Sequence, residues 1–385
     1  MKFSLPIYAD YSSSAPPLPE VVEAMMEWLG SSHANPHADH LPGHRAARAI
    51  DDARQRIGDL LGADPEGVIF TSGATESNNL ALKGLAGTCL GGLYVSSLDH
   101  SSIVEVARYL NDNGECRGGQ LQHDLYGSVS PDAVKASLSS GGGRALVALA
   151  HGNNEIGTIQ EVAAIGRAIS DGGHLFHVDA SQTAAHVPIS VHEMRISTLS
   201  ISGHKLYGPA GIGALWMDSQ LNDELLPLLH GGGQQGGARS GTVPAYLAVG
   251  LGTAAKLALD RMTESRAHLA SMTTLFLEAL HGNGIDPVII GHPTKRLPGH
   301  LSLRFPGATA PDLLSRLAPH VALSTGAACS SGELRASRVL RALGMDEESA
   351  GEGVRVSFGR STTRREAKQA AGHIANAVRA VLDLN

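Results

Sequence analysis

The sequence has few cysteines, and they lie far apart. Its three cysteines, Cys89, Cys116 and Cys329, form neither a disulfide framework nor a paired zinc motif. Four histidines occur between His33 and His44, but their spacing differs from that of the common zinc sites. We therefore predict free thiols and no metal site.

The chain also lacks clusters of basic residues and long apolar runs. Its formal net charge is -7 and no run of lysines and arginines occurs, so direct binding of nucleic acid is not expected. No apolar run reaches the roughly 18 residues of a membrane span. The first residues contain no signal-peptide core. We expect a soluble, cytoplasmic protein without membrane contact.

What the chain does contain is an alternation of strand-like and helix-like segments. Strands are predicted at residues 92–96, 144–150, 175–178, 198–202 and 212–216, with helices between them, for example at 103–110 and 162–170. This alternation predicts an α/β protein whose mainly parallel sheet is covered by helices on both faces.

The length of the chain predicts two domains. At 385 residues, it exceeds the roughly 250–300 residues at which a single core stops growing. We assign residues 16–255 to a large domain that contains the sheet. Residues 256–385, joined by residues 1–15, are predicted to form a smaller α+β domain. One long helix at about 243–280 is expected to lead into it.

Polar residues gather after four of the predicted strands. The clusters are Asp99-His100, Asn153-Asn154-Glu155, Asp179-Ala180-Ser181-Gln182 and Ser202-Gly203-His204-Lys205. Ligands of such sheets bind at the carboxyl ends of the strands. The clusters therefore predict one shared pocket.

Lys205 lies on a turn between two apolar segments. A lysine held in such surroundings tends to lose its proton, and a neutral amine suits Schiff-base chemistry with an aldehyde cofactor. Taken alone, an exposed lysine on a β-turn explains the same pattern.

The segment TSGATESNN, at residues 71–79, links a predicted strand to a predicted helix. Unpaired N–H groups and the positive end of the helix dipole make such a junction an anion site, here suited to a single phosphate ester. The alternative is an ordinary helix start capped by Ser72 or Thr75.

Together these features describe a pocket for pyridoxal 5'-phosphate. Lys205 would supply the amine, and Asp179 would keep the ring nitrogen protonated. His100 would stack on the ring, and Gln182 or Asn154 would contact the phenolic oxygen. The groups expected to hold the phosphate are Ala74, Thr75, Ser202, His204 and, from a neighbouring subunit, Thr242.

Five motifs carry a resemblance to a known family. They are TSGATESNN (71–79), NNEIG (153–157), HVDASQ (177–182), SGHKLYGP (202–209) and RSGT (239–242). The chain resembles NifS/IscS-type cysteine desulfurases, which belong to the class V aminotransferase family of fold-type I pyridoxal phosphate enzymes. The resemblance implies that fold and the cofactor roles given above, with His100 also moving protons. It further implies a homodimer in which the 239–242 loop contributes to the partner's site.

Cys329 lies in the segment STGAACSSG, at residues 324–332, which resembles the catalytic loop of these desulfurases. A run of small residues exposes its thiol, as a nucleophile that attacks sulfur and carries a persulfide requires. Cys89 and Cys116 are expected to be buried and inert.

The resemblance also assigns substrate contacts. Arg355 matches the arginine that binds the substrate carboxylate, and Asn35 stands where the family has a Gly-Asn-Pro motif, although Ala34 replaces the glycine. Two further segments depart from the family: SSAP at 13–16, and GGGQQ at 231–235, which loses the carboxylate of GGGQE.

The resulting hypothesis is an L-cysteine desulfurase that produces L-alanine and a persulfide on Cys329 for an acceptor protein. The alternatives are a selenocysteine lyase or a class V aminotransferase on the same scaffold, and a cofactor-binding regulator without turnover. The sequence leaves the acceptor open among iron–sulfur assembly, tRNA thiolation, cofactor synthesis and DNA sulfur modification.

Overall fold

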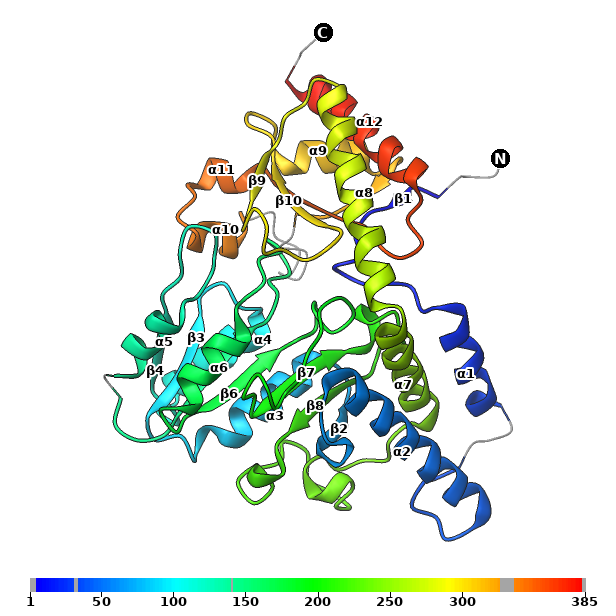
Figure 1. The fold of residues 1–385 in the computed structure, drawn as a ribbon, viewed down its shortest axis with the longest axis vertical. Coiled ribbons are helices and arrows are strands. Elements are labelled where there is room, and N and C mark those ends of the chain that lie inside the picture. Colours follow the sequence, from blue (N-terminus) through cyan, green and yellow to red (C-terminus); the bar gives the residue numbers. More distant parts are fainter. Residues whose placement is uncertain (1–4, 31–33, 140, 326–335, 383–385) are drawn as a thin grey trace.

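The computed structural model describes residues 5–30, 34–139, 141–325 and 336–382. Its main feature is a seven-stranded sheet in the order β2-β8-β7-β6-β5-β3-β4 (Figure 1). The strands are β2 (Val68–Thr71), β3 (Gly92–Ser96), β4 (Gly118–Leu121), β5 (Ala145–Ala150), β6 (Leu175–Asp179), β7 (Thr198–Ser202) and β8 (Gly213–Met217). Within this described sheet β8 runs opposite to the other six strands, which are parallel to one another. This mainly parallel sheet confirms the predicted α/β class.

Successive side chains of the strands enter two apolar layers, because strand side chains alternate between the faces of a sheet. Tyr94 and Val147 lie in one cluster, and Leu93 and Leu146 lie in the other. The first layer is covered by α2 (Leu41–Leu61), α5 (Pro131–Leu138), α6 (Val162–Ser170) and α7 (Ala245–Asp260), and the second by α3 (Ala74–Ala86) and α4 (Ser101–Asp112). Helix α1 (Pro19–Leu29) packs on α7.

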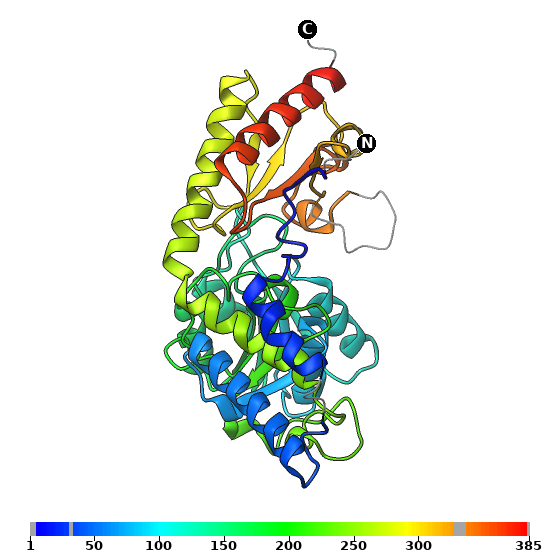
Figure 2. The same cartoon turned by 90° about the vertical axis from the view of Figure 1, so that its right-hand side faces the viewer.

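A separate apolar core lies at the other end of the molecule. There β12 (Gly353–Ser357), β10 (His300–Arg304) and β9 (Val288–Ile290) form an antiparallel sheet with α8 (Met262–Gly282), α9 (Ala310–Leu317) and α12 (Arg364–Val381) packed on it. Figure 2 shows α8 and α12 side by side. The N-terminal strand β1 (Ile7–Tyr8) pairs with β11 (Val321–Ala322), and Ile7 and Ala9 pack in this core.

The single helix expected at about 243–280 is wrong, because the chain forms two helices there. Arg261 separates α7 from α8 with φ -110° and ψ 10°, and its guanidinium bonds Glu20 of α1 at 2.7 Å. Met262 still packs in the core of the large sheet, whereas Leu269 packs in the second core. This change of core supports the division into 16–255 and 1–15 with 256–385, which we retain as a proposal.

Among the described helices, none has the length and apolar character needed to cross a membrane.

Candidate active site

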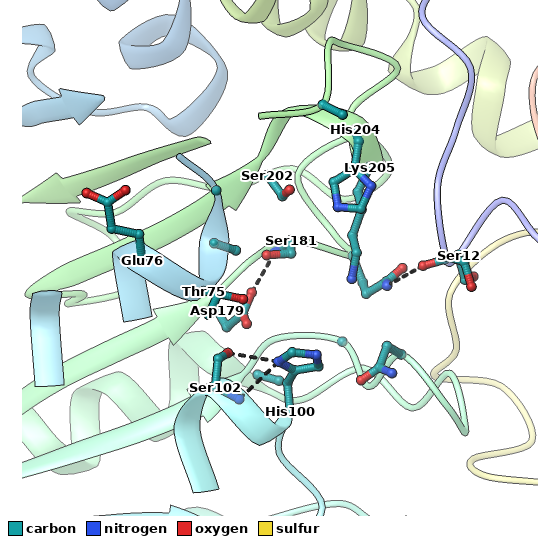
Figure 3. Close-up of a pocket in the computed structure, with 18 of the residues that line it drawn as sticks. Ser12, Thr75, Glu76, His100, Ser102, Asp179, Ser181, Ser202, His204 and Lys205 are labelled. Atoms are coloured by element: carbon teal, nitrogen blue, oxygen red, sulfur yellow. Dashed lines mark hydrogen bonds between the residues drawn. The ribbon is translucent and has the colours of Figure 1, made fainter. Parts of the chain in front are cut away.

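A cavity of about 590 Å³ lies where β5, β6 and β7 end (Figure 3), and Arg355 of β12 lines it as well. It is lined by ten of the predicted site residues: Ala74, Thr75, His100, Asn154, Asp179, Gln182, Ser202, His204, Lys205 and Arg355. The four polar clusters predicted at strand ends therefore meet in one place. Ser12, Ser13, Glu76 and Ser181 also line the cavity and were not assigned from the sequence.

Lys205 ends a short 3-10 turn, Gly203–Lys205, that follows β7 directly. The turn is so tight that a side chain does not fit at position 203, because a Cβ added to Gly203 would lie 2.4 Å from the carbonyl oxygen of Pro209. Leu206 and Tyr207 are buried immediately after it and anchor the turn in the core. Lys205 is therefore held at the cavity wall (Figure 3), which contradicts the reading as a lysine on a free surface turn.

Asp179 is the last residue of β6 and is only 7% exposed. One carboxylate oxygen accepts the Ser181 N–H at 2.9 Å, and the other accepts the Asn78 amide at 2.9 Å. Burial alone would raise the pKa of Asp179, but these hydrogen bonds outweigh it and hold the pKa below its usual value. These bonds therefore favour the charged form of Asp179 at the cavity.

Asn78, in the second turn of α3, is a buried residue that the sequence reasoning did not assign. Besides Asp179, its amide donates to Ser102 Oγ at 2.8 Å, and its carbonyl oxygen accepts Ser200 Oγ–H at 2.5 Å. The same oxygen lies 3.0 Å from His177 Nε2, and burial lowers the pKa of His177 to about 4. The sequence did contain a signal for this role, because Asn78 falls among the apolar side chains that α3 turns toward the sheet.

His100 caps α4 and faces Asp179 across the cavity (Figure 3). Its Nδ1 accepts the Ser102 N–H at 3.2 Å and lies 2.8 Å from Ser102 Oγ. A nitrogen that accepts cannot carry the proton, so the neutral ring has its proton on Nε2. Burial lowers the pKa of His100, Lys205 adds to this, and Asp179 opposes it.

Helix α3 begins at the cavity with Gly73 as its N-cap, and no side chain caps it. The alternative of a helix start capped by Ser72 or Thr75 is therefore wrong. The first N–H groups of a helix have no partner inside it, and those of Ala74 and Thr75 belong to this set. The helix start lies close to β8: a Cβ at Gly213 would lie 2.7 Å from Gly73 Cα. The start of α3 lines the cavity together with Ser202 and His204, and its free N–H groups are suited to an anion; we call it the anion cradle.

Arg355 reaches the cavity from β12 of the small domain and is 3% exposed. Its guanidinium donates to Asp10 Oδ1 at 2.7 Å, to the carbonyl oxygen of Asn154 at 2.8 Å and to Ser13 Oγ. Its buried Nε has no hydrogen-bond partner among the described residues. Gln182 donates to the carbonyl oxygen of Ser12 at 2.9 Å.

Two predicted site residues lie elsewhere, and a third falls outside the described residues. Asn35 and Thr242 are exposed and do not line the cavity of their own chain, and Asn35 instead accepts the His37 N–H at 3.0 Å. Cys329 lies outside the described residues. Cys89 and Cys116 are buried as expected, and burial raises the pKa of both thiols.

Comparison with known proteins gives consistent matches along the chain. The family described as aminotransferase class-V matches residues 7–369. Cysteine desulfurase IscS of Rickettsia bellii is 37% identical, over 99% of this chain and 93% of that protein. A solved NifS-like protein has a TM-score of 0.88 and 28% identity, covering 97% and 99% of the two chains. The structure titled SspA in complex with cysteine has a TM-score of 0.80 and 34% identity, covering 92% and 99%.

Proposed function

Because the chain belongs to the aminotransferase class-V family and is similar along its length to cysteine desulfurases, we propose that it is a pyridoxal 5'-phosphate-dependent L-cysteine desulfurase. The observation that carries this proposal is the convergence of three groups on one cavity. They are the amine-bearing Lys205, the buried and charged Asp179, and the uncapped start of α3.

These residues fit the cofactor part by part. Asp179 carries a negative charge where a protonated ring nitrogen needs one, and the N–H groups of Ala74 and Thr75 suit a phosphate. His100, Gln182 and Asn154 line the same cavity; the imidazole would cover a ring face, and the two amides would contact the phenolic oxygen. When bound, the cofactor withdraws electrons from the amino-bearing carbon of the substrate.

Different side chains of the protein then bind L-cysteine, move its proton and accept its sulfur. Arg355 binds the substrate carboxylate, as a guanidinium fork does, and Asn35 is the further substrate contact. The Lys205 amine and His100 Nε2 move the proton of the amino-bearing carbon. The Cys329 thiolate bonds the substrate sulfur as the carbon–sulfur bond breaks. Protonation of the carbon left behind gives L-alanine, and the sulfur stays on Cys329 as a persulfide.

The persulfide is passed to an acceptor protein in the cytoplasm. The protein acts as a homodimer in which Thr242 of each 239–242 loop completes the phosphate site of the other subunit. Exposure of Thr242 supports this assignment, because a residue meant for a partner's site must be accessible.

The decisive experiment compares Cys329→Ser with Cys116→Ser in the purified enzyme. We expect Cys329→Ser to retain the cofactor absorbance and to lose alanine formation from cysteine by about 1,000-fold or more. Cys116→Ser, which exchanges a buried thiol far from the cavity, should keep most of the activity. Wild-type rates in Cys329→Ser would refute the mechanism. Formation of a keto acid would indicate a class V aminotransferase. A strong preference for selenocysteine over cysteine would indicate a selenocysteine lyase.

A further inference from the structure

The edge strand β2 of the large sheet ends at the anion cradle. Its only partner in the described sheet is β8, so alternate backbone groups of β2 face outward. Unpaired edges of this kind are normally covered by another part of the chain. Here the cover comes from the loop at residues 230–242, which contains the GGGQQ departure from the family pattern.

Gln235 of this loop bonds β2 as a neighbouring strand would. Its side-chain oxygen accepts the Phe70 N–H at 2.7 Å, and its amide donates to the Phe70 carbonyl oxygen at 2.9 Å. The backbone of Gln235 has φ 54°, a conformation that residues with side chains rarely adopt. Such a conformation persists where the surroundings fix it. The paired amide holds Gln235 on β2, and the Ala238 N–H donates to the Gln235 carbonyl oxygen at 3.2 Å.

The same loop reaches the first turn of α3. Gln234 closes the loop by accepting the Gly241 N–H at 2.8 Å. Between these residues, Arg239 Nε donates to Glu76 Oε1 at 2.8 Å, while Glu76 Oε2 accepts the Ser72 N–H at 2.7 Å. Residues 234–241 therefore connect β2 just before the cradle with α3 just after it.

Glu76 lines the cavity and stays charged. Burial raises its pKa, but the bonds from Arg239 and Ser72 outweigh this and lower it. A bare carboxylate beside the cradle would repel a phosphate, and the Arg239 guanidinium compensates that charge. The cradle accordingly depends on Arg239 being held in place.

We propose that Gln235 is a positioning residue for the cradle: its amide fixes the loop on β2 so that Arg239 neutralises Glu76. The inference rests on the proposed function, because the cradle is assigned there to the cofactor phosphate. In this chain the amide makes both bonds to Phe70, whereas a carboxylate at position 235 could accept the Phe70 N–H but could not donate to the Phe70 carbonyl oxygen. This gives a physical reason for glutamine at a position where the family pattern has glutamate.

The test compares Gln235→Glu with Gln234→Glu. Both variants add one negative charge at adjacent positions of the loop, but Glu at position 234 can still accept the Gly241 N–H. We expect Gln235→Glu to weaken pyridoxal 5'-phosphate binding about tenfold at pH 8. Gln234→Glu should stay within about threefold of wild type. Equilibrium dialysis of the holoenzyme measures both. Equal dissociation constants for the two variants would overturn the proposal.

A second readout separates a lost hydrogen bond from general damage. A protonated carboxylic acid has one donor and one acceptor, like the amide it replaces. The deficit of Gln235→Glu relative to wild type should therefore shrink when both proteins are measured at pH 5.5. A deficit that stays the same at both pH values would also refute the proposal.

The loop itself can be followed without the cofactor. Trypsin cleavage after Arg239 should be faster in the apo form of Gln235→Glu than in the apo forms of wild type and Gln234→Glu. If the wild-type protein binds no pyridoxal 5'-phosphate, the proposed function fails. The cleavage rates then still decide whether Gln235 holds the loop, and equal rates would refute that.

Discussion

The two sides of the cavity are built in different ways. On the cofactor side, Asp179, Asn78 and Ser102 are buried and bond one another within the large sheet and its helices. On the substrate side, Arg355 comes from the small domain and contacts Asp10 and Asn154, which lie far from it in sequence. The bonded groups of the first side all belong to the large sheet and its helices, whereas the second side depends on how two cores meet.

This difference implies different consequences of mutation. A change on the cofactor side should alter charge at a fixed site and affect the chemical step. Under the proposed function, a change on the substrate side should alter binding, because Arg355 is the group proposed to hold the substrate carboxylate. Three predictions test this comparison, from the largest expected effect to the smallest.

The largest effect is expected for Asp179→Asn. The substitution keeps the shape and an acceptor for the Ser181 N–H but removes the charge from the cavity floor. We expect kcat to fall about 100-fold or more, as for other losses of a fixed electrostatic contact, with a smaller change in KM. Steady-state rates of alanine formation measure both.

Asp124→Asn is the matched control for this substitution. Like Asp179, Asp124 accepts two N–H groups, here the backbone N–H groups of Tyr126 and Ser128 at 2.9 and 2.8 Å, but it lies on an exposed turn outside the cavity. The activity of Asp124→Asn should equal that of the wild-type protein. Equal activities of the two variants would mean that the buried charge has no catalytic role.

A smaller effect, and mainly on binding, is expected for Arg355→Lys. Lysine keeps the charge opposite Asp10 but loses the planar fork that binds a carboxylate through two parallel bonds. We expect KM for cysteine to rise about 10- to 100-fold, with kcat changed less. Arg304→Lys is the control, because Arg304 lies on the neighbouring strand β10 and bonds Glu352 at 2.9 Å outside the cavity. A fall in kcat at constant KM would erase the distinction between the two sides.

The cofactor side was also easier to predict from the sequence. Its residues follow strands directly, so a correct prediction of β6 and β7 places Asp179 and Lys205 at the same edge. The long helix was mispredicted because apolar spacing continues through Arg261, and only the packing of the two halves on different cores reveals the break. Asn78 was missed because its role depends on Ser200 and His177, which no local pattern connects to it.

Arg355 could be named only through the resemblance to a family. Its bond to Asp10 joins residues at opposite ends of the chain, and no periodicity indicates such a contact. The same limit applied to Gln235, whose partner Phe70 is recognisable only once β2 is known to be an edge strand. Contacts between distant segments are set by the assembled fold, and local sequence patterns do not encode them.

The smallest effect concerns the free energy of unfolding as a function of pH. His151 and His177 are buried beside the sheet, and burial lowers the pKa of each to about 4. The unfolded chain binds protons at these histidines below about pH 6.5 while the folded chain does not. Stability should therefore fall as the pH drops from 6.5 toward 4, by about 1.4 kcal/mol per pH unit and histidine.

Asp99 acts with the opposite sign. Burial raises its pKa to about 7, so the folded chain binds a proton there that the unfolded chain releases above about pH 4. Its contribution therefore offsets one of the two histidines. Urea unfolding of wild type at pH 6.5 and pH 5 should give the lower free energy at pH 5, and His151→Leu should reduce this difference. Because His151 directly follows β5 and His177 lies in β6, an unchanged pH dependence in His151→Leu would show that the core around these strands does not hold its histidines neutral.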